Sequence, residues 1–163
     1  FRLSDEATHG TKIFILERGE GDPMTYKPAG PAAAATLDHV VINTFSPDRA
    51  LALYGAKLGL NLALDRSNAS WDARLMFFRT GGSTVELAHR LSKGESHAPD
   101  KLWGLSWRVP DIEAAHARLQ SAGLQLSDTR PGRRPGSRVF SVKSGTLGVP
   151  TLILANGPAN RAA

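Results

Sequence analysis

Leu37-Asp38-His39-Val40-Val41-Ile42 opens a stretch of sequence that the second half of the chain repeats. The first copy closes on Ser83-Thr84-Val85-Glu86-Leu87-Ala88, and the second runs from Trp103-Gly104-Leu105-Ser106-Trp107 to Pro150-Thr151-Leu152-Ile153-Leu154-Ala155. Corresponding landmarks in the two copies are separated by a nearly constant offset of about 65 residues. A constant offset over several landmarks indicates an internal duplication.

Each copy has the pattern of a βαβββ module. A run rich in β-branched residues predicts a first strand, at 39–43 and 105–109. Ser46 and Asp111 are suited to capping the helix that follows, which we expect to end at a glycine. Three short strands should then complete each copy: 61–66, 74–79 and 84–88 in the first, and 125–127, 139–143 and 151–155 in the second.

The opening "LDHVVI", the segment "VPDIEAAHARLQSAGL" and the closing "GGSTVELA" resemble the vicinal oxygen chelate superfamily. This superfamily includes glyoxalase I, bleomycin-resistance proteins, extradiol dioxygenases and methylmalonyl-CoA epimerase. The resemblance covers residues 37–155 and implies a glyoxalase-like α+β domain. Two βαβββ modules, 37–90 and 102–155, would form a curved mixed sheet around a cavity.

The composition of the chain argues against several classes of protein. The chain has 163 residues, 41% of them hydrophobic, and no cysteine, which predicts one domain without disulfides or thiol chemistry. We find neither a run of apolar residues of membrane-spanning length nor a secretory leader, so we expect a cytoplasmic protein that does not enter a membrane. Basic residues cluster between 130 and 143, but no recognition motif accompanies them, so we expect no nucleic-acid partner.

The N-terminal residues resemble the end of the second copy. The stretch from Ser4 to Leu16 resembles that from Ser141 to Leu154, with residues 8–10 falling on 146–148 and residues 13–16 on 151–154. We therefore interpret residues 1–18 as the remnant closing strand of a preceding module, followed by a Gly-, Pro- and Ala-rich linker at 19–36. Its apolar residues, 13–16, should be buried on both faces, at a sheet edge of this domain or of a second copy. We expect the chain to form a homodimer or to pair with an upstream domain of the parent chain. Residues 156–163 would be a tail.

The resemblance places metal ligands at His39 and Glu86. Imidazole and carboxylate groups suit divalent metals, so a divalent metal is possible here. The corresponding positions of the second copy are Gly104 and Ile153, and neither side chain can ligate. We therefore expect no cofactor and an incomplete metal site.

If a metal is bound, His39 and Glu86 would hold it, with His89, Asp72 or another subunit supplying the missing ligands. Without metal, these two residues could serve as catalytic general base and orienting group, and we expect them to approach each other across the cavity.

Several further side chains are expected to bind a small molecule. Arginines among them could pair with a carboxylate or phosphate, and aromatic residues could line an apolar pocket. The candidates are Asn43, Trp71, Arg74, Phe78, Trp103, Ser106, Arg108 and Arg138.

These features favour a glyoxalase/bleomycin-resistance-like domain that binds a small organic molecule. One alternative is a metal-dependent lyase, isomerase or epimerase with a rearranged ligand set. Another is a non-catalytic domain of a larger two-domain protein. An extradiol dioxygenase is disfavoured, because the resemblance would require ligands where Gly104 and Ile153 stand.

Overall fold

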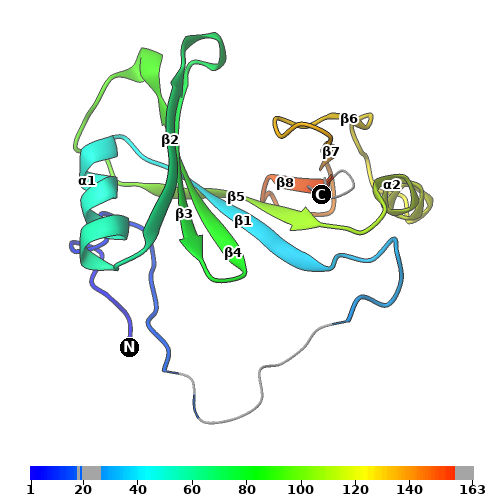
Figure 1. Ribbon diagram of the computed structural model, residues 1–163, viewed down its shortest axis with the longest axis horizontal. Helices are drawn as coiled ribbons and strands as arrows, with labels where there is room; N and C mark the ends of the chain where they lie inside the picture. The colour runs from blue at the N-terminus through cyan, green and yellow to red at the C-terminus, as the bar shows by residue number, and fades with distance from the viewer. Residues whose placement is uncertain (18, 20–26, 157–163) are drawn as a thin grey trace, which may run out of the picture. The chain divides into compact units, whose positions relative to one another are not determined.

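The computed structural model describes residues 1–17, 19 and 27–156 (Figure 1). The chain divides into two compact units. The first comprises residues 1–24 and 40–103, and the second comprises residues 25–39 and 104–163. Within the described residues, no helix is long and apolar enough to cross a membrane.

The strands form one open mixed sheet in the order β2-β3-β4-β1-β5-β8-β7-β6, which confirms the predicted glyoxalase-like α+β class. Their bounds are Thr36–Asn43 (β1), Asn61–Asn68 (β2), Ala73–Thr80 (β3), Ser83–Arg90 (β4), Lys101–Arg108 (β5), Arg130–Pro131 (β6), Arg138–Val142 (β7) and Thr151–Ala155 (β8). The helices are α1 (Pro47–Leu51), its π-helical continuation η1 (Ala52–Lys57), α2 (Ile112–Ser121), and two short 3-10 turns, η2 (Ala69–Trp71) and η3 (Leu91–Lys93).

In the first unit, β2, β3 and β4 pair antiparallel and pack against α1 and η1. Met76 lies opposite Leu87 and Phe78 lies opposite Val85 in the β3–β4 ladder. These side chains join the helical residues in one core: Ile42, Ala50, Leu53, Tyr54, Met76, Phe78 and Leu87. Because side chains alternate along a strand, Glu86 faces away from this core.

In the second unit, β8 pairs parallel with β5 and antiparallel with β7. The core of this unit packs against α2 and consists of Val109, Ile112, Ala115, Phe140, Val142, Ile153 and Ala155. Trp107 packs against this core, so Ser106 and Arg108 face the opposite side of β5. The expected strand at 125–127 is reduced to an isolated bridge between Leu126 and Val142.

The predicted helix ends are confirmed only in part. Asp111 caps α2 by accepting from the backbone N–H groups of Glu113 and Ala114, both at 3.0 Å. Ser46 makes no side-chain capping bond to α1. Gly59 and Gly123 adopt the positive φ angles, 69° and 81°, expected after each helix.

The predicted burial of the N-terminal strand is wrong within this chain. Residues 13–16 form only an isolated bridge, from Phe14 to Arg2, and Phe14 and Leu16 are 61% and 84% exposed. Much of the expected linker, residues 18 and 20–26, lies outside the described residues, as does the expected tail from 157 onward.

Candidate functional site

A continuous chain of polar contacts occupies the face of the second unit opposite its core. Asp38 Oδ1 lies 2.8 Å from His39 Nδ1, and Ser106 Oγ lies 2.7 Å from His39 Nε2. On the other side of the carboxylate, Arg108 Nε donates to Asp38 Oδ2 at 2.9 Å, and a second guanidinium nitrogen contacts the same oxygen. Four residues from β1 and β5 therefore form one hydrogen-bonded series.

The charge of Asp38 fixes where the protons lie in this series. The hydrogen bond from His39 is the largest influence lowering the pKa of Asp38, with Arg108 acting in the same direction and burial acting against both. An ionised carboxylate only accepts, so His39 Nδ1 must donate to it. In the neutral imidazole, Nε2 is then an acceptor and takes its hydrogen bond from the Ser106 hydroxyl.

This order of groups, carboxylate, imidazole and hydroxyl, is that of Ser-His-Asp triads. There the carboxylate holds the imidazole in one tautomer and stabilises it once it is protonated. The His39 side chain is 16% exposed and Ser106 is 2% exposed. Between the imidazole and the hydroxyl, the imidazole is therefore the group that a ligand can reach more readily, while Arg108, at 40%, is the most exposed side chain of the series.

Sequence reasoning selected His39, Ser106 and Arg108 but missed Asp38, which joins two of them. A signal was available, since Asp38 directly precedes His39 in the quoted strand. Neighbours along a strand point to opposite faces, which argued against a contact. Asp38 and His39 nevertheless bond side chain to side chain at the start of β1.

Glu86 is 8% exposed on the face of β4 opposite the first core. Its predicted approach to His39 stays a prediction, because the two residues belong to different units. The predicted correspondence between Glu86 and Ile153 in the two copies is wrong, because Glu86 faces away from the core of its unit whereas Ile153 packs inside the core of the second unit. The residues of β8 that alternate away from that core are Leu152 and Leu154, and neither can ligate a metal.

The other arginines expected to bind a ligand already have partners. Arg74 forms a bidentate pair with Asp65, with nitrogen–oxygen distances of 2.9 and 2.7 Å. This pairing is the main cause that lowers the pKa of Asp65. Arg138 forms an ion pair with Glu113. Either arginine would have to give up its carboxylate to bind an anionic ligand.

The aromatic candidates lie in different surroundings. Phe78 is fully buried in the first core, with its ring centroid 6.0 Å from that of Tyr54, so the structure gives it a packing role. Trp71 lies in η2 with the Arg66 guanidinium 5.7 Å from its ring centroid. Trp103, at the start of β5, is 52% exposed. Asn43 is half-buried at the end of β1.

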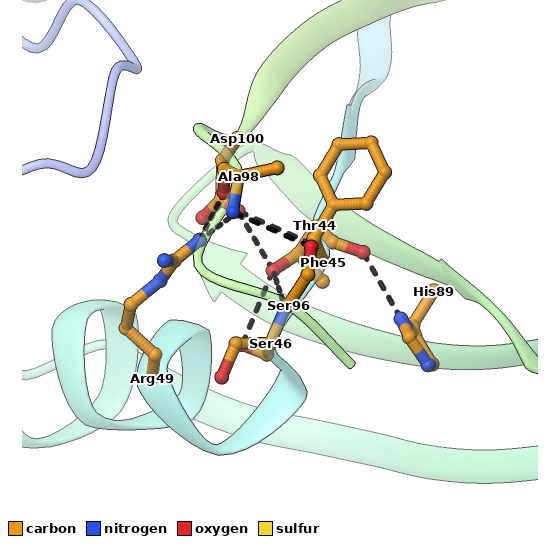
Figure 2. A network of polar contacts seen from close by, with 8 residues as sticks. All are labelled: Thr44, Phe45, Ser46, Arg49, His89, Ser96, Ala98 and Asp100. Carbon is orange, nitrogen blue, oxygen red and sulfur yellow. Dashed lines mark hydrogen bonds and ion pairs between the residues drawn. The ribbon is translucent and has the colours of Figure 1, made fainter. Parts of the chain in front are cut away.

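The first unit contains a second polar network that sequence reasoning did not find (Figure 2). Asp100 is 2% exposed and accepts from Thr44 Oγ1 at 2.9 Å and from Arg49 Nη2 at 2.8 Å. The Thr44 carbonyl oxygen lies 3.1 Å from Nδ1 of His89. This network joins the end of β1, the start of α1 and the loop before β5, and it engages the histidine proposed as a substitute metal ligand.

The model of the Glyoxalase/Bleomycin resistance protein/Dioxygenase superfamily matches residues 38–140. The chain belongs to this superfamily. No curated protein matches the chain.

Solved structures of similar fold include methylmalonyl-CoA epimerases. The one from Mycobacterium tuberculosis is 25% identical with a TM-score of 0.65, over 80% of this chain and 93% of that chain. A hypothetical protein from Bacillus halodurans C-125 is 23% identical with a TM-score of 0.65, covering 76% and 95%. A Streptomyces coelicolor epimerase in complex with 2-nitronate-propionyl-CoA is 18% identical with a TM-score of 0.63, covering 76% and 96%. The latter two show the fold alone.

The side chains of this superfamily member do not fit the metal site that the family resemblance implies. Both ring nitrogens of His39 are engaged, by Asp38 and Ser106. At Gly104, an added Cβ would lie 2.7 Å from the carbonyl oxygen of Pro150, so the position has no room for a ligating side chain. Across residues 1–17, 19 and 27–156, no three His, Asp or Glu side chains gather closely enough to hold a metal.

The predicted substitute ligand Asp72 is also engaged. Its two carboxylate oxygens accept from the backbone N–H of Ser92 at 2.7 Å and from the Ser92 hydroxyl at 2.6 Å. These two bonds are the largest influences lowering its pKa. A metal at Asp72 would therefore have to displace the contact that connects η2 to the residues after β4.

Proposed function

We propose that this chain is a small-molecule-binding member of the superfamily in which His39 acts as a proton acceptor without the usual metal ligand set. The observation that carries the proposal is the Asp38–His39–Ser106 series, with contacts of 2.8 and 2.7 Å on the two ring nitrogens. Imidazole is the side chain best suited to accept and return a proton near neutral pH.

In the proposed step, an acidic group of the ligand replaces the Ser106 hydroxyl as the hydrogen-bond partner of His39 Nε2. The proton moves to Nε2, and the electron pair stays on the ligand. The resulting imidazolium is stabilised by the Asp38 carboxylate, which Arg108 holds in place. Asp38, Ser106 and Arg108 are positioning residues here, because they act through His39.

Ligand-induced stabilisation tests the binding part of the proposal. We expect methylmalonyl-CoA, or a smaller carbonyl compound from a panel, to raise the melting temperature of the chain, because a ligand that binds only the folded state stabilises it. His39→Ala should abolish most of the shift. His97→Gln is the matched control, since His97 is exposed in the loop before β5. An equal shift in His39→Ala would place the ligand elsewhere.

A second candidate function, proton exchange next to a carbonyl as in an epimerase, is supported by the similarity to the Mycobacterium tuberculosis methylmalonyl-CoA epimerase. In D2O, NMR should show loss of the C2 proton signal of methylmalonyl-CoA. Removing a general base typically costs about 10²- to 10⁴-fold in rate, which is the expected effect of His39→Ala. Ser106→Thr should retain more activity than Ser106→Ala, because it keeps the hydroxyl.

These measurements also separate the remaining alternative. A non-catalytic domain of a larger protein would show neither a shift in melting temperature with any compound nor proton exchange. A metal-dependent enzyme would show exchange that requires stoichiometric metal.

A further inference from the structure

Residues 1–16 form a hairpin. The backbone N–H of Leu3 donates to the carbonyl of Ile13 at 3.0 Å, and that of Ile15 donates to the carbonyl of Phe1 at 2.8 Å. These bonds flank the antiparallel bridge between Arg2 and Phe14. Two short segments therefore pair as β7 and β8 do in the second unit.

The turn of this hairpin has the same unusual backbone as the turn before β8. His9 and Gly10 have φ angles of 53° and 98°, and Leu147 and Gly148 have 52° and 81°. A positive φ is uncommon for residues other than glycine, so its recurrence at both aligned positions is informative. The same backbone hydrogen bond also closes both turns. The N–H of Thr11 donates to the carbonyl of Thr8 at 3.2 Å, and the N–H of Val149 donates to the carbonyl of Thr146 at 3.0 Å.

This equivalence places residues 13–16 on residues 151–154 of β8. In the second unit, β8 is covered in two ways. Strand β5 lies along its edge, where Leu105 donates to the carbonyl of Pro150 and Val109 to that of Leu154, both at 2.9 Å. Helix α2 covers Ile153 within the second core.

The N-terminal hairpin has neither cover. Phe14, Ile15 and Leu16 are 61%, 40% and 84% exposed, whereas Ile153 and Leu154 are 6% and 8% exposed. The edge that would correspond to the β5 side carries the backbone groups of Lys12, Phe14 and Leu16. Among the described residues, none of these groups has a backbone hydrogen bond. An unpaired apolar strand edge is a template for another strand.

The other end of the hairpin is fixed to the first unit. The backbone N–H of Asp100 donates to the carbonyl of His9 at 2.7 Å, and Ile13 packs against the first core. Thr8 is fully buried. The hairpin therefore presents residues 14–16 from an anchored base.

We propose that residues 13–16 are a docking edge for the strand and helix that open a βαβββ module other than the two described above. The equivalence with the second unit indicates the occupant. There, the parallel strand β5 and the helix α2 cover the corresponding hairpin, which β7 and β8 form. The strand supplies hydrogen bonds to Lys12, Phe14 and Leu16, and the helix covers Ile15.

A peptide of residues 101–123, which contains β5 and α2, serves as the probe for the full-length chain. Amide hydrogen exchange at Phe14 and Leu16, followed by NMR, reports on pairing of the edge. We expect exchange at both amides to slow at least tenfold when the peptide is saturating. The same peptide with Trp107→Asp and Val109→Asp, which cannot present an apolar strand face, should have no effect.

Leu16→Asp should abolish the slowing, and because Leu16 is 84% exposed this change should leave the fold intact. Leu147→Asp is the matched control, since Leu147 is fully exposed on the other hairpin turn and aspartate tolerates a positive φ. Two results would overturn the proposal. One is unchanged exchange at millimolar peptide. The other is protection of these amides in the absence of peptide that becomes stronger as the protein concentration rises, because a second copy of the chain would then occupy the edge.

Discussion

Asp38 connects His39 to Arg108, and its charge gives the site a defined pH dependence. Its pKa is lowered in the folded chain, first by His39 and then by Arg108. A carboxyl with a depressed folded pKa contributes stability above its unfolded pKa of about 3.9, and the contribution is lost as the pH falls through the folded value. We expect Asp38→Asn to reduce the free energy of unfolding by about 1 to 3 kcal/mol at pH 7.

The difference from the wild-type chain should shrink as the pH falls below about 4, because the unfolded wild-type chain then takes up a proton at Asp38 while the folded chain takes it up only at lower pH. Urea denaturation of both proteins at several pH values measures this difference in the free energy of unfolding. A difference that stays constant from pH 7 to pH 3 would contradict the charged role of Asp38.

Gly104 is fixed by its backbone neighbour and not by turn geometry. A Cβ there would meet the Pro150 carbonyl oxygen at 2.7 Å. We expect Gly104→Ala to destabilise the chain by about 1 to 3 kcal/mol through overpacking, and Gly104→His to destabilise it without creating a metal site. Gly82→Ala, where the added Cβ meets no atom within 4 Å, is the control. Equal melting temperatures for all variants would contradict this prediction, because they would show that the backbone at Gly104 and Pro150 moves apart without cost to accept a side chain.

At the residue scale, the sequence selected some site residues and misplaced others. His39, Ser106 and Arg108 lie in the polar series because alternation along β5 put two of them on one face. Phe78 and Ile153 were assigned to the wrong face. Both are apolar residues in apolar strands, where alternation carries little contrast and a shift of one residue cannot be detected.

At the scale of the elements, the two helices begin with different strengths. Asp111 caps α2 with two hydrogen bonds of 3.0 Å, whereas Ser46 makes none to α1. Asp111→Ala should lower the free energy of unfolding by about 1 kcal/mol. Ser46→Ala serves as the paired comparison and should change it by much less. Thermal unfolding checks both, and a larger loss for Ser46→Ala would contradict the assignment of caps.

The buried network of Figure 2 connects three elements through one carboxylate. The Asp100 side chain has no exposed surface, and Arg49 supplies its counter-charge at 2.8 Å. Arg49→Leu leaves that charge unpaired and should destabilise the chain by about 3 to 5 kcal/mol. Thr44→Val removes one neutral donor and should cost about 1 to 3 kcal/mol. A milder effect of Arg49→Leu in denaturation experiments would contradict the importance of the Arg49–Asp100 ion pair.

The duplication explains why the elements were predictable. Strands β3, β4, β7 and β8 fall close to their expected positions because each pattern occurs twice in the chain. The N-terminal hairpin shows the limit of such reasoning. Its apolar sequence was interpreted as a buried strand, but burial depends on a covering strand and helix, which a local pattern does not contain.

At the scale of the whole molecule, membership of the superfamily follows from landmarks spread over residues 38–140. The chemistry does not follow, because one fold supports many activities. Two features of this chain argue against the metal site that the family resemblance implies: Gly104 cannot hold a ligand, and His39 already bonds Asp38 and Ser106. Those bonds could not be predicted from spacing, since they depend on side-chain conformations at the start of one strand.

The side-chain nitrogen resonances of His39, recorded by NMR during a zinc titration of the purified chain, show whether this histidine binds metal. We expect a proton on Nδ1, a hydrogen bond accepted by Nε2, and no change in either resonance at one equivalent of zinc. Ser106→Ala should shift the Nε2 resonance alone. A His39 Nε2 resonance that moves with zinc and saturates at one equivalent would contradict the account, because it would show that this histidine is a metal ligand.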